Sequence, residues 1–222
     1  MFKQAWKVWA CGVLAALMLT GCKPERSADM PSASDLRTGQ LLRFGGWDNK
    51  DLNWYVLDIQ GRKVMLMLAE AELGKIPYNE KKEPVTWETC TLRQWLNGEF
   101  YAKAFTENEK KYILEVTVPA DRNPYFSNVD SGKAAQDRVF LLSIPEYEKL
   151  LTSEEMRIFM KPGKIHKQGE RDGVYWWLRS PGCESIKAAF VFNHGNALFT
   201  YGDWVTNGFI AVRPILWIEL KS

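Results

Sequence analysis

The feature that most constrains the fold is an apolar, aromatic run near the end of the chain that contains a single arginine. Residues 174–182 have the sequence VYWWLRSPG, and residues 208–217 have the similar sequence GFIAVRPILW. Both runs are rich in β-branched and aromatic residues and are bounded by Gly or Pro, which predicts strands. A charged residue inside such a strand is normally paired or hydrogen-bonded. We therefore expect Arg179 and Arg213 to hold carboxylates or backbone carbonyls, with a role as polar ligand anchors as the alternative.

The N-terminus has the features of a secretory signal peptide. Lys3 and Lys7 precede an apolar run over residues 8–19, which is too short to span a bilayer as a helix. The run ends in the sequence LTGC at residues 19–22. This ending resembles the lipobox of bacterial lipoproteins, and the resemblance implies cleavage after residue 21 and lipidation of Cys22.

The resemblance also implies a location in the bacterial cell envelope. Lys23 follows Cys22 where an inner-membrane retention signal would place Asp, so the outer membrane is expected in a Gram-negative cell. In a Gram-positive cell the anchor would lie in the outer leaflet of the plasma membrane. Residues 22–40 are rich in Pro, Ser and charge, which predicts a flexible tether. Residues 41–222 are then expected to form a single globular domain.

The charge balance gives no support for a nucleic-acid partner. The whole chain has 29 basic and 27 acidic residues. Loss of residues 1–21 removes Lys3 and Lys7 and no acid, which leaves 27 of each. Nucleic-acid-binding domains usually show a basic excess on one face.

The first half of the domain should contain strands and then helices. Three strands are expected at residues 42–47, 53–59 and 63–68, the last two joined as a hairpin. The amphipathic pattern of residues 91–105 predicts a helix with Gly98 as a weak point. Thr106 with Glu109 forms a capping-box pattern that starts another helix.

The second half should alternate short strands with one further helix. Ser143 is expected to cap a helix over residues 145–151. Residues 119–136 form a long polar loop. The expected strands are residues 116–118, 137–143, 174–180, 188–192, 197–201 and 208–217, and a further helix start lies at residues 152–155.

Four motifs together resemble one bacterial family that is known only as a domain of unknown function. They are TWETCTLRQWLN at residues 86–97, DRVFLLS at 137–143, WWLRSPG at 176–182 and VRP at 212–214. The pattern is also similar to the C-type lectin-like fold, which formylglycine-generating enzymes share. This resemblance implies an α+β domain whose first and last strands pair, with two or more helices and with late loops that form the ligand surface.

The sequence contains no recognised catalytic constellation. His166 and His194 are far apart in sequence and lack the spacing of a metal site. Ser180 lies in a Ser-Pro-Gly turn and is expected to be a turn residue rather than a nucleophile. We therefore expect no metal, no cofactor and no enzymatic activity.

Two cysteines remain after Cys22 is lipidated, and they form a candidate disulfide. Cys90 and Cys183 would lie in an oxidising compartment, where an even pair of thiols is often joined. Two separately buried thiols are the alternative. Formylglycine-generating enzymes use cysteines and copper, so a related oxidoreductase is an alternative function.

These observations favour a membrane-anchored binding module that presents late loops to a glycan, peptide or protein ligand. Aromatic side chains combine large contact area with a polar handle, which suits recognition. A structural envelope lipoprotein is a further alternative. Trp54, Trp95 and Trp177 are expected in the core. The candidate ligand surface comprises Arg179, Arg213, Tyr175, Trp204 and Tyr201, with Tyr125 also expected to be exposed.

Overall fold

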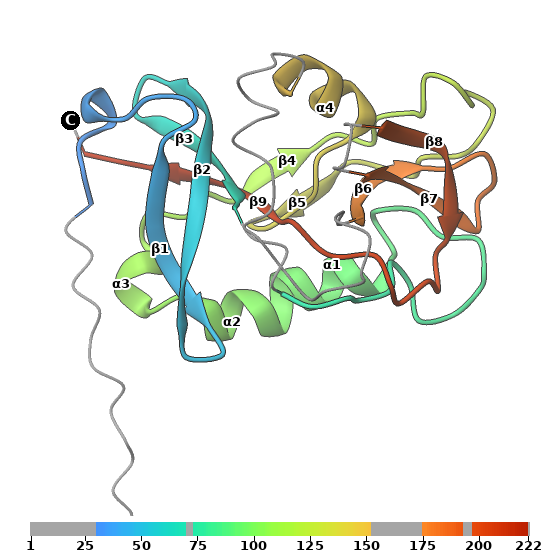
Figure 1. The fold of residues 1–222 in the computed structure, drawn as a ribbon, viewed down its shortest axis with the longest axis horizontal. Helices are drawn as coiled ribbons and strands as arrows, with labels where there is room; N and C mark the ends of the chain where they lie inside the picture. Colours follow the sequence, from blue (N-terminus) through green and yellow to red (C-terminus); the bar gives the residue numbers. More distant parts are fainter. Residues whose placement is uncertain (1–29, 70–72, 152–174, 193–196, 222) are drawn as a thin grey trace, which may run out of the picture.

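The computed structural model describes residues 30–69, 73–151, 175–192 and 197–221. The expected signal peptide, the lipidation site Cys22, His166, His194 and the helix start at residues 152–155 lie outside the described residues. The described chain has helices and antiparallel sheets, which confirms the predicted α+β class (Figure 1).

A four-stranded antiparallel sheet forms one side of the molecule. Its strands are β1 (Leu41–Trp47), β2 (Lys50–Gln60), β3 (Lys63–Leu68) and β9 (Ile215–Glu219), in the order β1-β2-β3-β9. The β1–β2 turn uses Asp48 and Asn49, whose φ angles are 47° and 62°. Positive φ at both central residues is the geometry of a type I′ turn, one of the two common turns of two-residue hairpins. The expected β2–β3 hairpin is also present.

The last strand does not pair with the first, contrary to expectation. β9 pairs with β3, and β1 lies at the opposite edge of the sheet. β9 also begins at Ile215 rather than near residue 208. Pro214 has no N–H to donate to a ladder, so regular pairing starts only after it. The outer edge of β9 is closed by bridges to Ile113 and Phe140.

The predicted helix over residues 91–105 is present but interrupted. It consists of α1 (Thr91–Trp95), a π-helical turn η2 (Leu96–Phe100) and α2 (Tyr101–Ala104). The wide turn contains Gly98, the position that the sequence marked as weak. The helix α3 (Glu107–Lys110) follows, with the predicted capping box.

A small hairpin and a short helix connect the two sheets. β4 (Val116–Val118) pairs with β5 (Ala135–Asp137), and α4 (Ile144–Leu150) starts at a capping box made by Ser143 and Glu146. The strand expected over residues 137–143 is wrong beyond its first residue. There successive backbone groups bond to different partners instead of one strand: the Val139 carbonyl accepts from the Asn97 side chain, whereas the Leu142 carbonyl accepts from the Arg179 N–H.

The second sheet consists of β6 (Tyr175–Pro181), β7 (Lys187–Phe192) and β8 (Ala197–Trp204) in sequential antiparallel order. It lies on the other side of the molecule from β1 and β2 (Figure 1). The end of β6 closes onto β8, because the Cys183 N–H donates to the Tyr201 carbonyl at 2.9 Å. A Cβ on Gly182 would lie 2.5 Å from that carbonyl oxygen, so a larger residue could not replace this glycine without a backbone shift.

The residues before β1 pack against the domain. Ser32 caps a 3₁₀ turn, η1 (Ala33–Asp35), and both Ala33 and Leu36 are buried. The second half of the segment expected to be a tether is therefore ordered. Within the described residues, no helix has the length and apolar character needed to cross a membrane.

Candidate binding surface

Four aromatic side chains from three adjacent strands form a continuous cluster, which we call the aromatic stack. Its members are Tyr175 on β6, Phe190 and Phe192 on β7, and Phe199 on β8. The rings of Phe190 and Phe199 are 4.7 Å apart and within 5° of parallel. The rings of Tyr175 and Phe192 are 4.6 Å apart at 23°. Tyr175 and Phe199 are 39% and 40% exposed, so the stack reaches solvent at both of its outer strands.

The stack is anchored to the interior by Trp177. This side chain is fully buried and lies edge-on to Phe190 at 6.4 Å. Its indole N–H donates to the Ile76 carbonyl at 3.0 Å, and the ring of Tyr78 packs against it at 5.8 Å. The stack therefore rests on a buried base, and its outer rings lie on strands of the sheet.

A second aromatic contact lies further along β8. Tyr201, which is 68% exposed, packs edge-on against Phe126 from the long polar loop at 4.8 Å. Asn123 is completely buried, and its Nδ2 donates to the carbonyls of Pro181 and Thr200, both at 2.8 Å. The root of the loop is thus fixed to β6 and β8. Tyr125, on the same loop, is exposed as predicted.

Trp204 at the end of β8 lies between two lysines. The Lys82 ammonium is 3.4 Å from the centre of the indole, and that of Lys187 is 4.9 Å away. Lys187 also bonds to Glu184 at 2.8 Å. These interactions raise the pKa of Lys187, with the Glu184 hydrogen bond as the main cause, and lower the pKa of Glu184 through the same bond. Trp204 is partly exposed, as expected for a surface residue.

Arg179 is part of the scaffold and does not line the surface. It is 3% exposed, and its guanidinium donates to the carbonyls of Leu141 and Pro119. It also forms ion pairs with Asp121 at 2.6 Å and with Glu146. The interpretation of Arg179 as a structural clamp is confirmed, and its assignment to the ligand surface is corrected, because its donors are used internally.

Arg213 has a similar role with different partners. It is also 3% exposed, and it donates to the carbonyls of Leu68 and Ala69, both at 3.1 Å. Its guanidinium lies 5.4 Å from the centre of the Trp176 ring. Burial lowers its pKa to about 10, which leaves it charged at neutral pH. Arg213 thus holds the end of β3 and is likewise removed from the candidate surface.

Cys90 and Cys183 are free thiols, so the candidate disulfide is not formed in this structure. Cys90 is buried at the N-cap of α1, where its Sγ accepts from the Arg93 N–H at 3.4 Å. Burial raises the pKa of Cys90 to about 12. Cys183 is half-buried on the turn after β6, with its Sγ 3.7 Å from the Lys187 ammonium.

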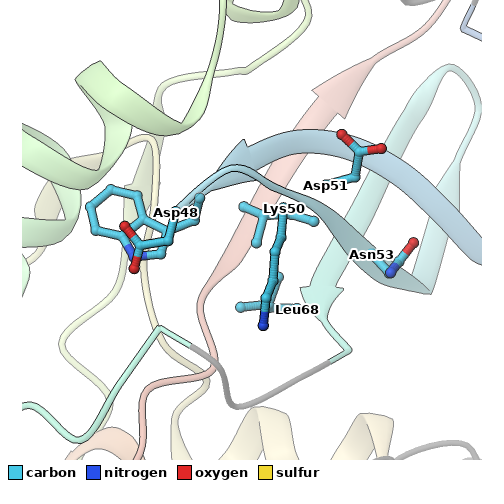
Figure 2. A pocket seen from close by; sticks show the side chains of 7 residues that line it. Asp48, Lys50, Asp51, Asn53 and Leu68 are labelled. Carbon is cyan, nitrogen blue, oxygen red and sulfur yellow. The ribbon is translucent and has the colours of Figure 1, made fainter.

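A small hollow lies at the other side of the molecule, beside the β1–β2 turn (Figure 2). Its volume is about 70 Å³, and its lining includes Trp47, Lys50 and Leu68. The side chains of Asp48 and Asp51 lie on opposite sides of the Lys50 side chain, so their carboxylates do not converge (Figure 2). Pockets for metabolites typically measure about 300 Å³ or more, so this hollow is too small for one.

Within the described ranges, no group of three or more His, Cys, Asp or Glu side chains is arranged to hold a metal ion. The buried carboxylate of Asp137 already has partners within the protein. Asp137 accepts from the indole of Trp87 at 2.8 Å and from Arg93 at 2.7 Å. Burial is the largest influence on its pKa, which is raised.

Comparison with known families identifies the domain. Residues 62–220 match the family described as domain of unknown function DUF6273. The chain belongs to this family. The predicted resemblance to an uncharacterised family of this kind is thereby confirmed. No curated protein and no solved structure shows significant similarity to the chain.

The DUF6273 match includes the whole of the second sheet and therefore the aromatic stack, whereas β1 and β2 precede it. Sequence reasoning found Tyr175, Tyr201 and Trp204 but missed Phe199 and Lys82. A pattern could have revealed Phe199, because it alternates with Tyr201 along a predicted strand and so lies on the same expected face. Nothing in the sequence near Lys82 indicates its contact with Trp204.

Proposed function

We propose that this protein is a membrane-anchored binding module of the bacterial cell envelope, without catalytic activity. The observation that carries the proposal is the aromatic stack. It is exposed at Tyr175 and Phe199, and its inner part packs against the buried Trp177. Rigid aromatic side chains give large contact area at low entropic cost, and they dominate the energetics of many interfaces. The ligand is a glycan, a peptide or a protein.

The lipid anchor is part of the same proposal. It rests on the sequence alone, namely the apolar run over residues 8–19 and the LTGC ending at Cys22. Mass spectrometry of the purified N-terminus would find diacylated Cys22 as the first residue. A mature chain that still began at Met1 would contradict the anchor.

A C-type lectin-like arrangement is the finer fold proposal. Three features support it: the four-stranded antiparallel sheet, the helices between β3 and β6, and the late β6–β8 sheet, which carries the candidate surface. The pairing of β9 with β3 departs from the expected pairing of first and last strands. An experimental structure with a ligand bound to β6–β8 would test both the fold and the place of binding.

The binding proposal can be tested with the detergent-solubilised full-length protein on arrays of cell-wall glycans and of peptides. The double variant Tyr175→Ala with Phe199→Ala should lose at least about tenfold in apparent affinity for any ligand bound by the wild type. Phe209→Ala is the matched control, because Phe209 is 77% exposed and is not part of the stack. Equal loss in both variants, or retention in the double variant, would contradict binding at the stack.

The copper-dependent oxidoreductase remains the alternative from a different class. It would require Cys90 and Cys183 to act on one metal ion. The contacts of the two sulfurs have no residue in common: Cys90 contacts Trp87 and Arg93, whereas Cys183 contacts Glu184 and Lys187. Copper titration of the wild type and of the variants Cys90→Ser and Cys183→Ser would separate the two classes, since only the oxidoreductase predicts thiol-dependent binding of one ion.

A further inference from the structure

The geometry of the aromatic stack limits what it can bind. Adjacent strands in a sheet lie about 4.7–4.9 Å apart. The Phe190 and Phe199 rings are parallel and separated by 4.7 Å, so they stand upright on neighbouring strands and cover each other's faces. Along its length, the stack therefore exposes the edges of its rings to solvent. It does not expose the ring faces on which a row of sugar rings would lie.

One ring face remains at the end of this arrangement. β8 is an edge strand, so Phe199 is the last ring of the stack in that direction. Among the described residues, its ring contacts Phe190 and no second ring. A further planar group would fit about 4.7 Å beyond Phe199, which is the position that a residue on an added strand would occupy.

The second half of β8 already bonds to other segments of the chain. The Thr200 carbonyl accepts from Asn123 Nδ2, and the Tyr201 carbonyl accepts from the Cys183 N–H. Phe126, three residues after Asn123, packs against Tyr201. Thus a polypeptide segment at this end both bonds to β8 and places an aromatic ring against one of its aromatic residues.

Among the described residues, β8 has no neighbouring strand on its outer side at its other end, where the strand begins. In the part of the chain that the structure describes, no strand or isolated bridge pairs with residues 197–199 on the side away from β7. Addition of a strand to an exposed sheet edge gives affinity through main-chain hydrogen bonds and specificity through alternate side chains. An extended peptide can use this edge and the Phe199 face together, whereas a glycan on the ring face has no main chain with which to continue the ladder of hydrogen bonds.

We propose that the edge of β8 at residues 197–199 binds an extended peptide segment that adds as a fourth strand and places an aromatic side chain against Phe199. The inference rests on the proposed binding function and names its ligand class. The partner is thus a polypeptide that contributes an aromatic residue in an extended conformation.

The test uses the detergent-solubilised full-length protein and a defined probe, the N-acetylated, C-amidated peptide Lys-Thr-Phe-Thr-Phe-Thr-Lys. Successive amides of a strand point to opposite sides, so two analogues are needed, each N-methylated on one alternate set of amides. One analogue should bind like the parent peptide, and the other should lose binding. Phe199→Ala should weaken parent binding about tenfold, and Phe209→Ala should leave it unchanged.

Equal affinity for the two methylated analogues would overturn strand addition, and so would wild-type affinity in Phe199→Ala. Failure of the parent peptide to bind at millimolar concentration would also overturn it. If the peptide fails while a cell-wall glycan binds in a Phe199-dependent manner, the proposed binding function stands and the peptide inference is wrong. If neither binds, both are wrong. Circular dichroism would verify that both variants remain folded.

Discussion

The two sheets both carry clusters of aromatic side chains, but the clusters differ in their relation to solvent. Under the four-stranded sheet, Phe44, Trp54, Phe100 and Phe105 are all at most 3% exposed. Their rings meet at varied angles, such as 36° for Phe44 with Phe105 and 83° for Phe100 with Phe105. On the three-stranded sheet, by contrast, two ring pairs lie within 23° of parallel, and the outer rings are partly exposed.

This difference separates packing from recognition. Tilted, interlocked rings fill an interior to the density of a solid core, and their positions are set by the helices that cover them. The aligned rings of the second sheet follow the spacing of their strands, because no described helix interleaves with them. Aromatic content alone would not distinguish the buried cluster from the aromatic stack. The two differ in the exposure of their rings and in the angles between them.

The largest expected contrast between the regions is in thiol reactivity. With a pKa of about 12, Cys90 would be about one part in ten thousand thiolate at pH 8, and it is also buried under α1. We expect Cys183 to react with a maleimide in the native protein, and Cys90 to react more than about a thousandfold more slowly. Peptide mapping after timed labelling measures both rates.

Labelling of the denatured protein provides the control, since both thiols should then react at similar rates. Two unreactive cysteines in denatured, unreduced protein from the envelope would instead show a disulfide, in conflict with the free thiols of the structure.

Truncation of the first aromatic cluster should cause the largest loss of stability. Trp54 is completely buried, and its indole N–H donates to the Phe44 carbonyl at 2.6 Å. Trp54→Ala removes the packing and leaves that carbonyl unsatisfied, with an expected cost of about 4–5 kcal/mol in the free energy of unfolding. Urea denaturation would measure it. A cost below about 1 kcal/mol would show that this cluster does not form a packed core, and its contrast with the exposed stack on the second sheet would fail.

Removal of the clamp beneath the second sheet should cost somewhat less. Arg179→Ala leaves Asp121 and Glu146 without their shared cation, but each of these carboxylates is about a quarter exposed and can be hydrated. We expect a loss of about 3 kcal/mol, at the low end for broken buried pairs. Differential scanning calorimetry gives the value. Unchanged stability with lost ligand binding would return Arg179 to the ligand surface.

Local signals in the sequence predicted much of the fold. The capping boxes at Thr106 and Ser143 follow from residue types at fixed spacing, and the structure confirms both. Burial of Trp54 and Trp177 is confirmed as well, whereas Trp95 is only partly buried. The buried arginines were correctly expected to be ion-paired or hydrogen-bonded, because an isolated charge in an apolar strand is very costly.

Long-range pairing could not be predicted in the same way. The choice of β3 rather than β1 as the neighbour of β9 depends on tertiary packing, which local sequence patterns do not indicate. The same holds for the site: Lys82 reaches Trp204 from a loop more than a hundred residues earlier in the chain. The exposed face of Phe199 follows from the position of β8 at a sheet edge, which no single segment encodes.

The smallest expected effect is the stability change on truncation of the surface aromatics. Phe199 is 40% exposed, and the described ring contact that it loses is the one with Phe190, so Phe199→Ala should cost about 1 kcal/mol or less. Phe190→Ala should cost about 3 kcal/mol, because Phe190 is only 8% exposed and also contacts Trp177. Thermal denaturation of the two variants compares a surface ring with its buried neighbour in one stack. If Phe199→Ala were as destabilising as Phe190→Ala, Phe199 would be a core residue, and its loss of binding could then be attributed to unfolding rather than recognition.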